Sequence, residues 1–213
     1  MRVRALRCGC ITLIDKRIRA IHLALEKRRA RLLEPGSAPR RASVALLLRP
    51  AAGDLEILLI QRPVSDRDPW SGHMALPGGR REENETALDT AIRETREEVG
   101  IDLSRHGMLL GRLDEVRPST GGPQIAVSPF VFAVDPAARL SIRPAEVAAA
   151  IWIPLGHLSE PASAAEHLHR LPGGGELRFP ALAYDDYVIW GLTYRMLIQF
   201  LGISRQVRAE APE

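Results

Sequence analysis

Three glutamates stand close together in one short stretch of the chain. Glu94 is followed by Glu97 and Glu98 at i+3 and i+4, a spacing that places all three on one side of an α-helix. Like charges at this spacing destabilise a helix by roughly 0.2–0.5 kcal/mol per pair. A divalent cation would offset that repulsion, and carboxylate oxygens are ligands that suit Mg²⁺ or Mn²⁺. The spacing therefore predicts a metal site.

The same stretch carries the signals of a helix that packs on a larger structure. Apolar or small side chains recur at i, i+3, i+4 and i+7, which is typical of an amphipathic helix. These side chains are Leu88, Ala91, Ile92, Thr95 and Val99. Thr86 and Asp89 match a capping box, and Gly100 stands where a helix commonly ends. We therefore expect the packed stripe to hold the acidic side outward.

Two glycines lie just ahead of this helix. The run Leu76-Pro77-Gly78-Gly79 indicates a strand that leads into a turn. Because glycine has no side chain, the backbone can pass close to a ligand at these positions. We expect Gly78 and Gly79 to contact substrate, and a backbone carbonyl near Gly79 to add an oxygen to the metal site.

From Gly79 to Ile101 the chain resembles the Nudix box, G-x5-E-x7-R-E-U-x-E-E-x-G-U, in which U is apolar. The matching residues are Gly79, Glu85, Arg93, Glu94, Glu97, Glu98, Gly100 and Ile101. Thr95 occupies the first U position, where its methyl group can still pack. The resemblance implies an α/β protein with the Nudix fold, an α/β/α sandwich around a mixed β-sheet. It also implies a hydrolase of a nucleoside diphosphate linked to another moiety.

The resemblance implies a mechanism as well. Metal ions held by the three glutamates would bridge the pyrophosphate oxygens, and a carboxylate would take the proton of the attacking water. Glu97 is the first candidate for this base and Glu94 is the second. Glu115 and Glu146 are candidates from outside the helix.

Several other side chains are expected to support this chemistry. Glu85 and Arg93 resemble the family's structural pair, in which a carboxylate outside the helix steadies the guanidinium. Arg62, Arg67 and Arg80 are candidate phosphate partners, because a guanidinium fork matches phosphate oxygens.

The segment from Leu58 to Gly79 resembles the stretch ahead of the box in coenzyme A pyrophosphatases, L-L-T-x-R-S-A-x3-R-x3-G-x3-F-P-G-G. The residues in register are Leu58, Leu59, Arg62, Gly72, Pro77, Gly78 and Gly79. The second arginine of the pattern is replaced by Asp68, and Arg67 lies one residue early. The resemblance implies hydrolysis of coenzyme A or acyl-CoA to 4′-phosphopantetheine and adenosine 3′,5′-bisphosphate.

Near the end of the chain, Ile189-Trp190-Gly191-Leu192-Thr193 is similar to the I-W-G-x-T run that opens the last helix of the same subfamily. Other functions stay open. One is hydrolysis of ADP-ribose, NADH or oxidised nucleotides. Another is nucleotide sensing without catalysis, which the full set of box glutamates argues against.

The first part of the chain is basic. Residues 1–41 hold 12 Lys and Arg against 3 Asp and Glu, whereas the rest holds 17 against 23. The stretch Ile14–Leu33 reads as an amphipathic helix, with Ile18, Ile21, Leu25 and Leu32 near one side. We expect an extra N-terminal helix packed on the domain, with its basic side in solvent. RNA binding, which predicts affinity falling steeply with salt, is the alternative, and no nucleic acid partner is expected.

Length and composition suit one enzyme domain with an appendage. We divide the 213 residues into an extension (1–41), a Nudix domain (42–205) and a tail (206–213). Cys8 and Cys10 are too few to staple a fold and indicate reduced thiols in the cytoplasm. No window approaches the roughly 18 apolar residues of a membrane span, and Met1–Ile14 lacks the features of a signal peptide. A monomer and a homodimer are both compatible with the sequence.

The expected elements after residue 41 alternate between strands and helices. Besides the box helix, the predicted strands are Ala42–Leu48, Leu55–Gln61, Leu109–Val116, Gln124–Val134 and Ala149–Pro154. A short helix is expected at Leu155–Ser159, a hairpin turn at residues 172–175, and a last helix at Gly191–Leu201.

Overall fold

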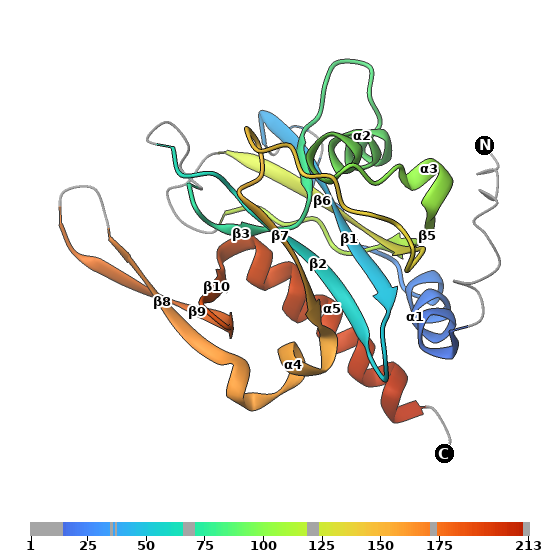
Figure 1. Ribbon diagram of the computed structural model, residues 1–213. Helices are drawn as coiled ribbons and strands as arrows, with labels where there is room; N and C mark the ends of the chain where they lie inside the picture. Colours follow the sequence, from blue (N-terminus) through green and yellow to red (C-terminus); the bar gives the residue numbers. More distant parts are fainter. Residues whose placement is uncertain are drawn as a thin grey trace.

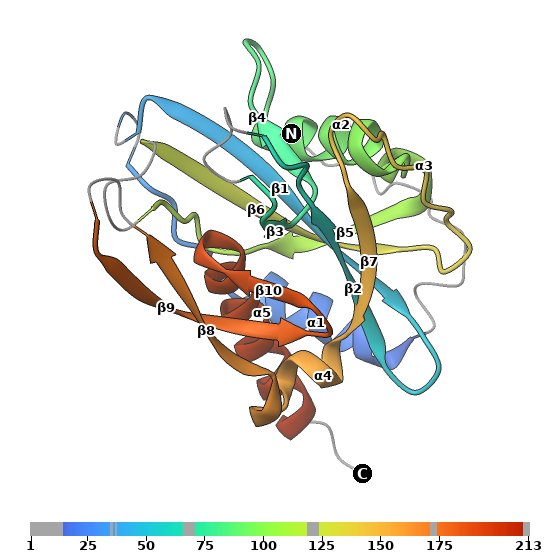
Figure 2. The same cartoon turned by 60° about the vertical axis from the view of Figure 1, so that its left-hand side comes forward.

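A mixed β-sheet covered by helices on both faces forms the centre of the protein (Figures 1 and 2). The computed structural model describes residues 15–34, 36, 38–65, 71–118, 124–170 and 174–210. The seven strands of this sheet follow the order β3-β2-β1-β6-β5, with β4 beside β1 and β7 beside β2. Strands β1 and β6 are parallel, and the other pairs are antiparallel. The predicted α/β/α sandwich around a mixed sheet is therefore confirmed.

The element bounds are as follows. The central sheet contains β1 (Arg40–Pro50), β2 (Leu55–Gln61), β3 (Met74–Ala75), β4 (Gly78–Arg80), β5 (Gly107–Arg112), β6 (Ile125–Val134) and β7 (Ala149–Pro154). A second, antiparallel sheet contains β8 (Ala164–Arg170), β9 (Glu176–Tyr184) and β10 (Tyr187–Trp190). The helices are α1 (Lys16–Lys27), α2 (Ala87–Val99), α3 (Leu103–His106), α4 (Leu155–Ser159) and α5 (Gly191–Glu210), with a 3₁₀ turn at Pro161–Ser163.

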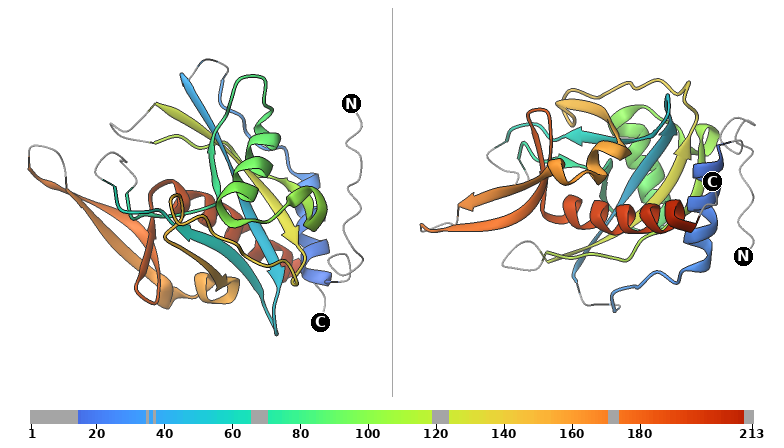
Figure 3. Two further views of the ribbon diagram at one scale, coloured as in Figure 1. Left: turned by 45° about the horizontal axis from the view of Figure 1, so that its top comes forward. Right: turned by 90° about the horizontal axis from the view of Figure 1, so that it is seen from below.

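Alternation along β1 divides the core into two halves. Successive strand residues point to opposite faces of a sheet. Ala45 and Leu47 belong to the half that packs against α2, whereas Leu46 and Leu48 belong to the half that packs against α1 and α5. Figure 3 shows α5 lying across the sheet on the face away from α2. The box helix is thus held on its own face by a dedicated apolar core.

The predicted N-terminal helix is shorter than expected. Asp15 caps α1 by accepting from the N–H groups of Arg17 and Ile18, and the helix ends at Lys27 rather than Leu33. The chain after α1 is extended because the N–H of Arg31 donates to Asp114 and the N–H of Leu33 donates to Glu115, each at 2.8 Å. Tertiary acceptors therefore replace the helical ones.

The packing expected of this helix is confirmed. Ile18, Ile21 and Leu25 are buried in the core half that contains α5, whereas Leu32 is 56% exposed. The proposed boundary after residue 41 falls inside β1, and the proposed tail begins inside α5. The division of the chain into extension, domain and tail stays a proposal.

Most predicted elements are present. The bounds of β7 and α4 match the expected ones, and α5 continues nine residues beyond Leu201. The predicted strand Leu109–Val116 is β5, which ends at Arg112, followed by an isolated bridge between Val116 and Val127. The predicted late hairpin is the β8–β9 pair, which extends away from the central sheet in Figure 1. None of the described helices is long and apolar enough to cross a bilayer.

Candidate active site

Helix α2 carries the box carboxylates, and its ends form as the sequence predicts. The Thr86 side chain accepts from the N–H of Asp89, and the Asp89 carboxylate accepts from the N–H of Thr86, so the capping box is present. Gly100 ends the helix at φ +73°, and its N–H donates to the carbonyl of Arg96. Thr95 is fully buried and donates its hydroxyl to the carbonyl of Ala91 at 2.7 Å.

The three glutamates do not all project outward as expected. Glu94 and Glu97 are half-buried, but Glu98 is only 4% exposed. The cause is helical geometry, because Glu98 lies three residues after Thr95 and seven after Ala91, both on the buried stripe. Glu98 therefore lies at the border of that stripe and faces Gly78 and Gly79, the two glycines at the start of β4, which we call the glycine turn.

The two glycines ahead of α2 contact two of its carboxylates. The N–H of Gly78 donates to Oε2 of Glu98 at 2.8 Å. A Cβ on Gly79 would overlap the carboxylate of Glu94, so the bare backbone of Gly79 lies directly against that group. The turn expected at Gly78 and Gly79 is instead the start of strand β4, where these residues pair with Val44 and Ser43 of β1. This pairing fixes the two glycines beneath the helix.

Arg93 organises the outer part of the cluster. Its Nε and Nη2 donate to the two carboxylate oxygens of Glu85, at 2.6 and 3.1 Å. Its Nη1 donates to Glu94 at 2.9 Å and to Glu97 at 3.0 Å. Nη2 also donates to the carbonyl of Arg80 at 3.1 Å. One guanidinium thus connects three carboxylates to the backbone of β4.

Burial and charge shift the carboxyl groups of the cluster in opposite directions. Hydrogen bonds from Arg93 lower the pKa of Glu85 to about 2, with further donation from the Thr90 hydroxyl and the Glu82 N–H. Burial raises the pKa of Glu94, and the hydrogen bond and charge of Arg93 only partly oppose this. The cluster therefore contains one strongly stabilised carboxylate and one that is destabilised as an anion.

Glu98 is shifted furthest upward. Burial raises the pKa of Glu98 to about 8, because the carboxylate loses its hydration. The hydrogen bond from Gly78 and the charge of Arg62 oppose this shift, whereas the charges of Glu94 and Glu146 add to it. The charges of Arg62 and Glu146, which are distant in sequence, thus act on Glu98 in the folded chain.

The donor set fits a hard divalent cation. Buried carboxylates that repel one another, beside a bare glycine backbone, provide oxygen ligands and excess negative charge of the kind that Mg²⁺ and Mn²⁺ neutralise. Nη1 of Arg93 already holds positive charge between Glu94 and Glu97. Within the described residues, no three His, Cys, Asp or Glu side chains are grouped closely enough to hold an ion, so Glu94, Glu97 and Glu98 supply suitable oxygens but do not converge on one point in this structure.

The other predicted site residues, two candidate phosphate partners and one candidate base, lie in different parts of the chain. Arg80 presents an exposed side chain, and its contact with Arg93 is made by its carbonyl. Arg67 lies outside the described residues. The Glu115 side chain is only 5% exposed and accepts from the hydroxyl of Ser128 at 2.6 Å and from the N–H of Leu33, and its role as a base stays a prediction.

Glu146, an outside candidate for the base, lies in the loop that precedes β7. It pairs with Arg143 at 2.9 Å, and the N–H of Arg143 donates to the backbone carbonyl of Glu98 at 3.1 Å. This loop therefore packs against the C-terminal end of α2. In the sequence, the only signal for Glu146 was its position three residues before the predicted strand Ala149–Pro154. The direction of its side chain depends on the path of the loop, which the sequence does not give.

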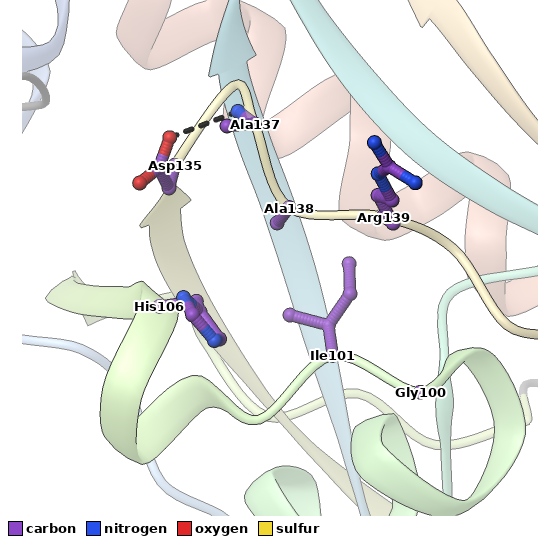
Figure 4. Close-up of a pocket in the computed structure, with 7 residues that line it drawn as sticks. All are labelled: Gly100, Ile101, His106, Asp135, Ala137, Ala138 and Arg139. Carbon is purple, nitrogen blue, oxygen red and sulfur yellow. Dashed lines mark hydrogen bonds between the residues drawn. The ribbon is translucent and has the colours of Figure 1, made fainter.

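A hollow of about 340 Å³ lies just beyond the C-terminal end of α2 (Figure 4). It is lined by Gly100, Ile101, His106, Asp135, Ala137, Ala138 and Arg139. None of the box carboxylates lines it, and its Asp135 is engaged with the N–H of Ala137 at 2.8 Å. We therefore identify the candidate active site from its chemistry at Glu98 and not from this hollow.

The sequence of the chain is similar to those of several known proteins. Residues 39–172 match the family model described as the NUDIX domain. An uncharacterized protein of Schizosaccharomyces pombe is 41% identical over 60% of this chain and 45% of its own length. The human mitochondrial coenzyme A diphosphatase NUDT8 is 29% identical over 73% of this chain and 65% of its own length.

The fold is also shared with a solved structure. A MutT/nudix family protein from Enterococcus faecalis has a TM-score of 0.53 at 19% identity, covering 86% of this chain and 66% of that one. The chain spans about half the length of the yeast relative. Since the match to the family model covers more than half of the residues, the chain belongs to the Nudix family.

Proposed function

We propose that this protein hydrolyses the pyrophosphate bond of coenzyme A or acyl-CoA in a metal-dependent reaction. The products would be 4′-phosphopantetheine and adenosine 3′,5′-bisphosphate. Support comes from family membership, from the likeness to the human coenzyme A diphosphatase, and from the subfamily-like stretch ahead of Gly79. The single observation that carries the hydrolase assignment is the buried carboxylate of Glu98, held by Gly78 on the helix that bears Glu94 and Glu97.

The cation would be held by Glu94, Glu97 and Glu98, together with a backbone carbonyl at Gly79. When bound, Mg²⁺ or Mn²⁺ would neutralise the pyrophosphate charge and acidify the attacking water. Two of these carboxylates, Glu94 and Glu98, are disfavoured as anions by burial and by repulsion from neighbouring carboxylates. Their repulsion favours binding of a cation over an empty cluster.

Glu97 is the proposed base, with Glu94 as the second candidate. The Glu97 side chain is 33% exposed, against 15% for Glu94, so its carboxylate is the more accessible to water and substrate. Both accept from Nη1 of Arg93, which orients them. Arg93 and Glu85 act as positioning residues.

The phosphates would be bound beside the cation site. Arg62 is the strongest candidate, because its charge already acts on Glu98. Gly78 and Gly79 would let the substrate approach the backbone closely. The exposed side chain of Arg80 and the side chain of Arg67 are further proposed phosphate partners.

Parallel turnover measurements test the substrate. Coenzyme A, acetyl-CoA, ADP-ribose, NADH and an oxidised nucleoside triphosphate are incubated with excess Mg²⁺ or Mn²⁺, and products are separated by chromatography. We expect kcat/KM for coenzyme A or acetyl-CoA to be at least about tenfold the value for ADP-ribose, NADH or the oxidised nucleotide, a difference of about 1.4 kcal/mol in transition-state stabilisation. Faster hydrolysis of ADP-ribose would reject the coenzyme A assignment, and binding with no product would favour a nucleotide sensor.

The cellular compartment is a separate proposal. Two closely spaced cysteines favour a reducing compartment, and we propose the cytoplasm. The human relative is named as mitochondrial, so fluorescence imaging of the tagged protein is the direct test.

A further inference from the structure

Five aromatic rings gather on the second sheet and on the segment ahead of the glycine turn. Trp190 lies at the centre, and His167 stacks on it with ring centroids 3.8 Å apart and planes 19° from parallel. His73 meets Trp190 edge-on at 4.7 Å. His169 and Phe179 lie 5.3 and 5.5 Å from Trp190. We call these five residues the aromatic cluster.

Strand pairing explains why most of these rings share one face. His167 and His169 alternate along β8, and His167 pairs with Phe179 of β9. Trp190 pairs with Ala181, two residues from Phe179. All five residues of the cluster are half-buried, so each keeps part of its surface exposed. The cluster is therefore a partly open aromatic surface and not a closed core.

His73 connects the cluster to the candidate active site. Its carbonyl accepts from the N–H of Arg62 at 3.0 Å, and the charge of Arg62 acts on Glu98. His73 is five residues before Gly78, and that length of chain spans at most about 18 Å. His73, and with it the aromatic cluster, therefore lies within about 18 Å of the glycine turn.

We propose that the aromatic cluster binds the purine base of the substrate by stacking. This inference rests on the proposed function and names the part of the substrate that is recognised next to the pyrophosphate. Exposed aromatic faces stack well with a planar base, and imidazole nitrogens can donate to or accept from a purine edge. A pantetheine arm has no ring to stack, so this surface suits the nucleoside half.

The charge state of the cluster agrees with this role. Burial, and then the nearby His169, lower the pKa of His167 below its usual range. A neutral ring at pH 7 keeps one donor and one acceptor nitrogen.

Tryptophan fluorescence in EDTA tests the proposal without turnover. The chain has three tryptophans, so each titration is repeated in Trp190→Phe to isolate the signal of Trp190. AMP and ribose 5-phosphate are compared, because they share the sugar and phosphate but only AMP has a base. We expect AMP to quench Trp190 and ribose 5-phosphate to leave it unchanged.

Two substitutions at one position separate stacking from packing. His167→Leu removes the aromatic plane and should weaken AMP binding about tenfold, whereas His167→Phe keeps the plane and should stay within about threefold. Leu168→Ala, on the other face of β8 and 49% exposed, is the control and should bind as the wild type does. Thermal melting verifies that each variant is folded.

The outcomes distinguish this inference from the proposed function. Equal quenching of Trp190 by ribose 5-phosphate and by AMP would overturn the base site. The base site would also be overturned if 4′-phosphopantetheine, which has no base, displaced AMP and His167→Leu bound AMP as tightly as the wild type. AMP binding at Trp190 in a protein that does not hydrolyse coenzyme A would leave the base site standing and reject the proposed substrate. Should His167→Leu fail to fold, the comparison of AMP with ribose 5-phosphate on the wild type still decides.

Discussion

Arg93 donates to both carboxylate oxygens of Glu85, from Nε at 2.6 Å and from Nη2 at 3.1 Å. Its remaining N–H directions go to Glu94, Glu97 and the carbonyl of Arg80. A guanidinium has five N–H donors in a planar fork, and here each has an acceptor. This arrangement fixes the outer carboxylates of the helix relative to the glycine turn.

Arg93→Lys should separate charge from geometry. A lysine has three donors on one nitrogen and cannot make the two-pronged contact with Glu85. We expect kcat to fall on the order of 100-fold, because the carboxylates lose their orientation, and the free energy of unfolding to fall by about 2 kcal/mol. Steady-state kinetics and urea unfolding measure the two effects. Arg96→Lys, at an exposed position of the same helix, is the control, and equal behaviour of the two variants would contradict the role of Arg93.

The Glu85–Arg93 pair predicts a dependence of stability on pH. The pKa of Glu85 is about 2 in the folded protein, below its ordinary value of 4.5. A carboxyl with a lowered folded pKa contributes stability above its unfolded pKa and loses it as the pH falls through the folded pKa. Wild type should therefore exceed Glu85→Gln by about 2 kcal/mol at pH 6, and the difference should shrink between about pH 4.5 and 2. Urea unfolding of both proteins across this range is the measurement, and a constant difference would speak against the pair.

Removing the buried carboxylate should abolish turnover but not folding. Glu98→Gln keeps the size of the side chain and its contact with Gly78, and it relieves an anion that burial disfavours. We expect magnesium-dependent kcat to fall at least about 100-fold for Glu98→Gln and for Glu94→Gln. We also expect the rise in Tm on adding Mg²⁺ to disappear in both variants.

Glu83→Gln is the matched control, since Glu83 is exposed and lies just ahead of the helix. It should retain activity and the magnesium-induced rise in Tm. Full activity in Glu98→Gln would remove the basis for the metal site.

The glycine turn predicts a steric effect. Gly78 has φ +153°, and a Cβ there would overlap the carbonyl oxygen of Ser43 and the Cα of Val44. Gly78→Ala should therefore cost about 2–4 kcal/mol of unfolding free energy. Gly202→Ala lies inside α5 with open space around its Cβ, so it should stabilise by about 0.5–1 kcal/mol. Urea unfolding compares them, and a neutral effect of Gly78→Ala would mean that β4 can move away from β1.

Local signals were sufficient for much of the fold. The capping box and Gly100 predicted both ends of α2, and short apolar runs between turn residues predicted β7 and α4. These features depend on contacts within a few residues. The short end of α1 was missed because its cause, acceptance by Asp114 and Glu115, lies more than 80 residues away.

The sequence by itself determined the chemistry of the candidate site, because the Nudix-like spacing places Glu94, Glu97 and Glu98 on one helix with Arg93 beside them. The tertiary structure decided which carboxylate is buried and which distant groups act on it. Solvation and charge depend on neighbours in space, so the upward shift of the pKa of Glu98 could not be read from spacing alone. The same holds for the aromatic cluster, whose rings come from β8, β9, β10 and the segment ahead of β3, which only the folded chain brings together.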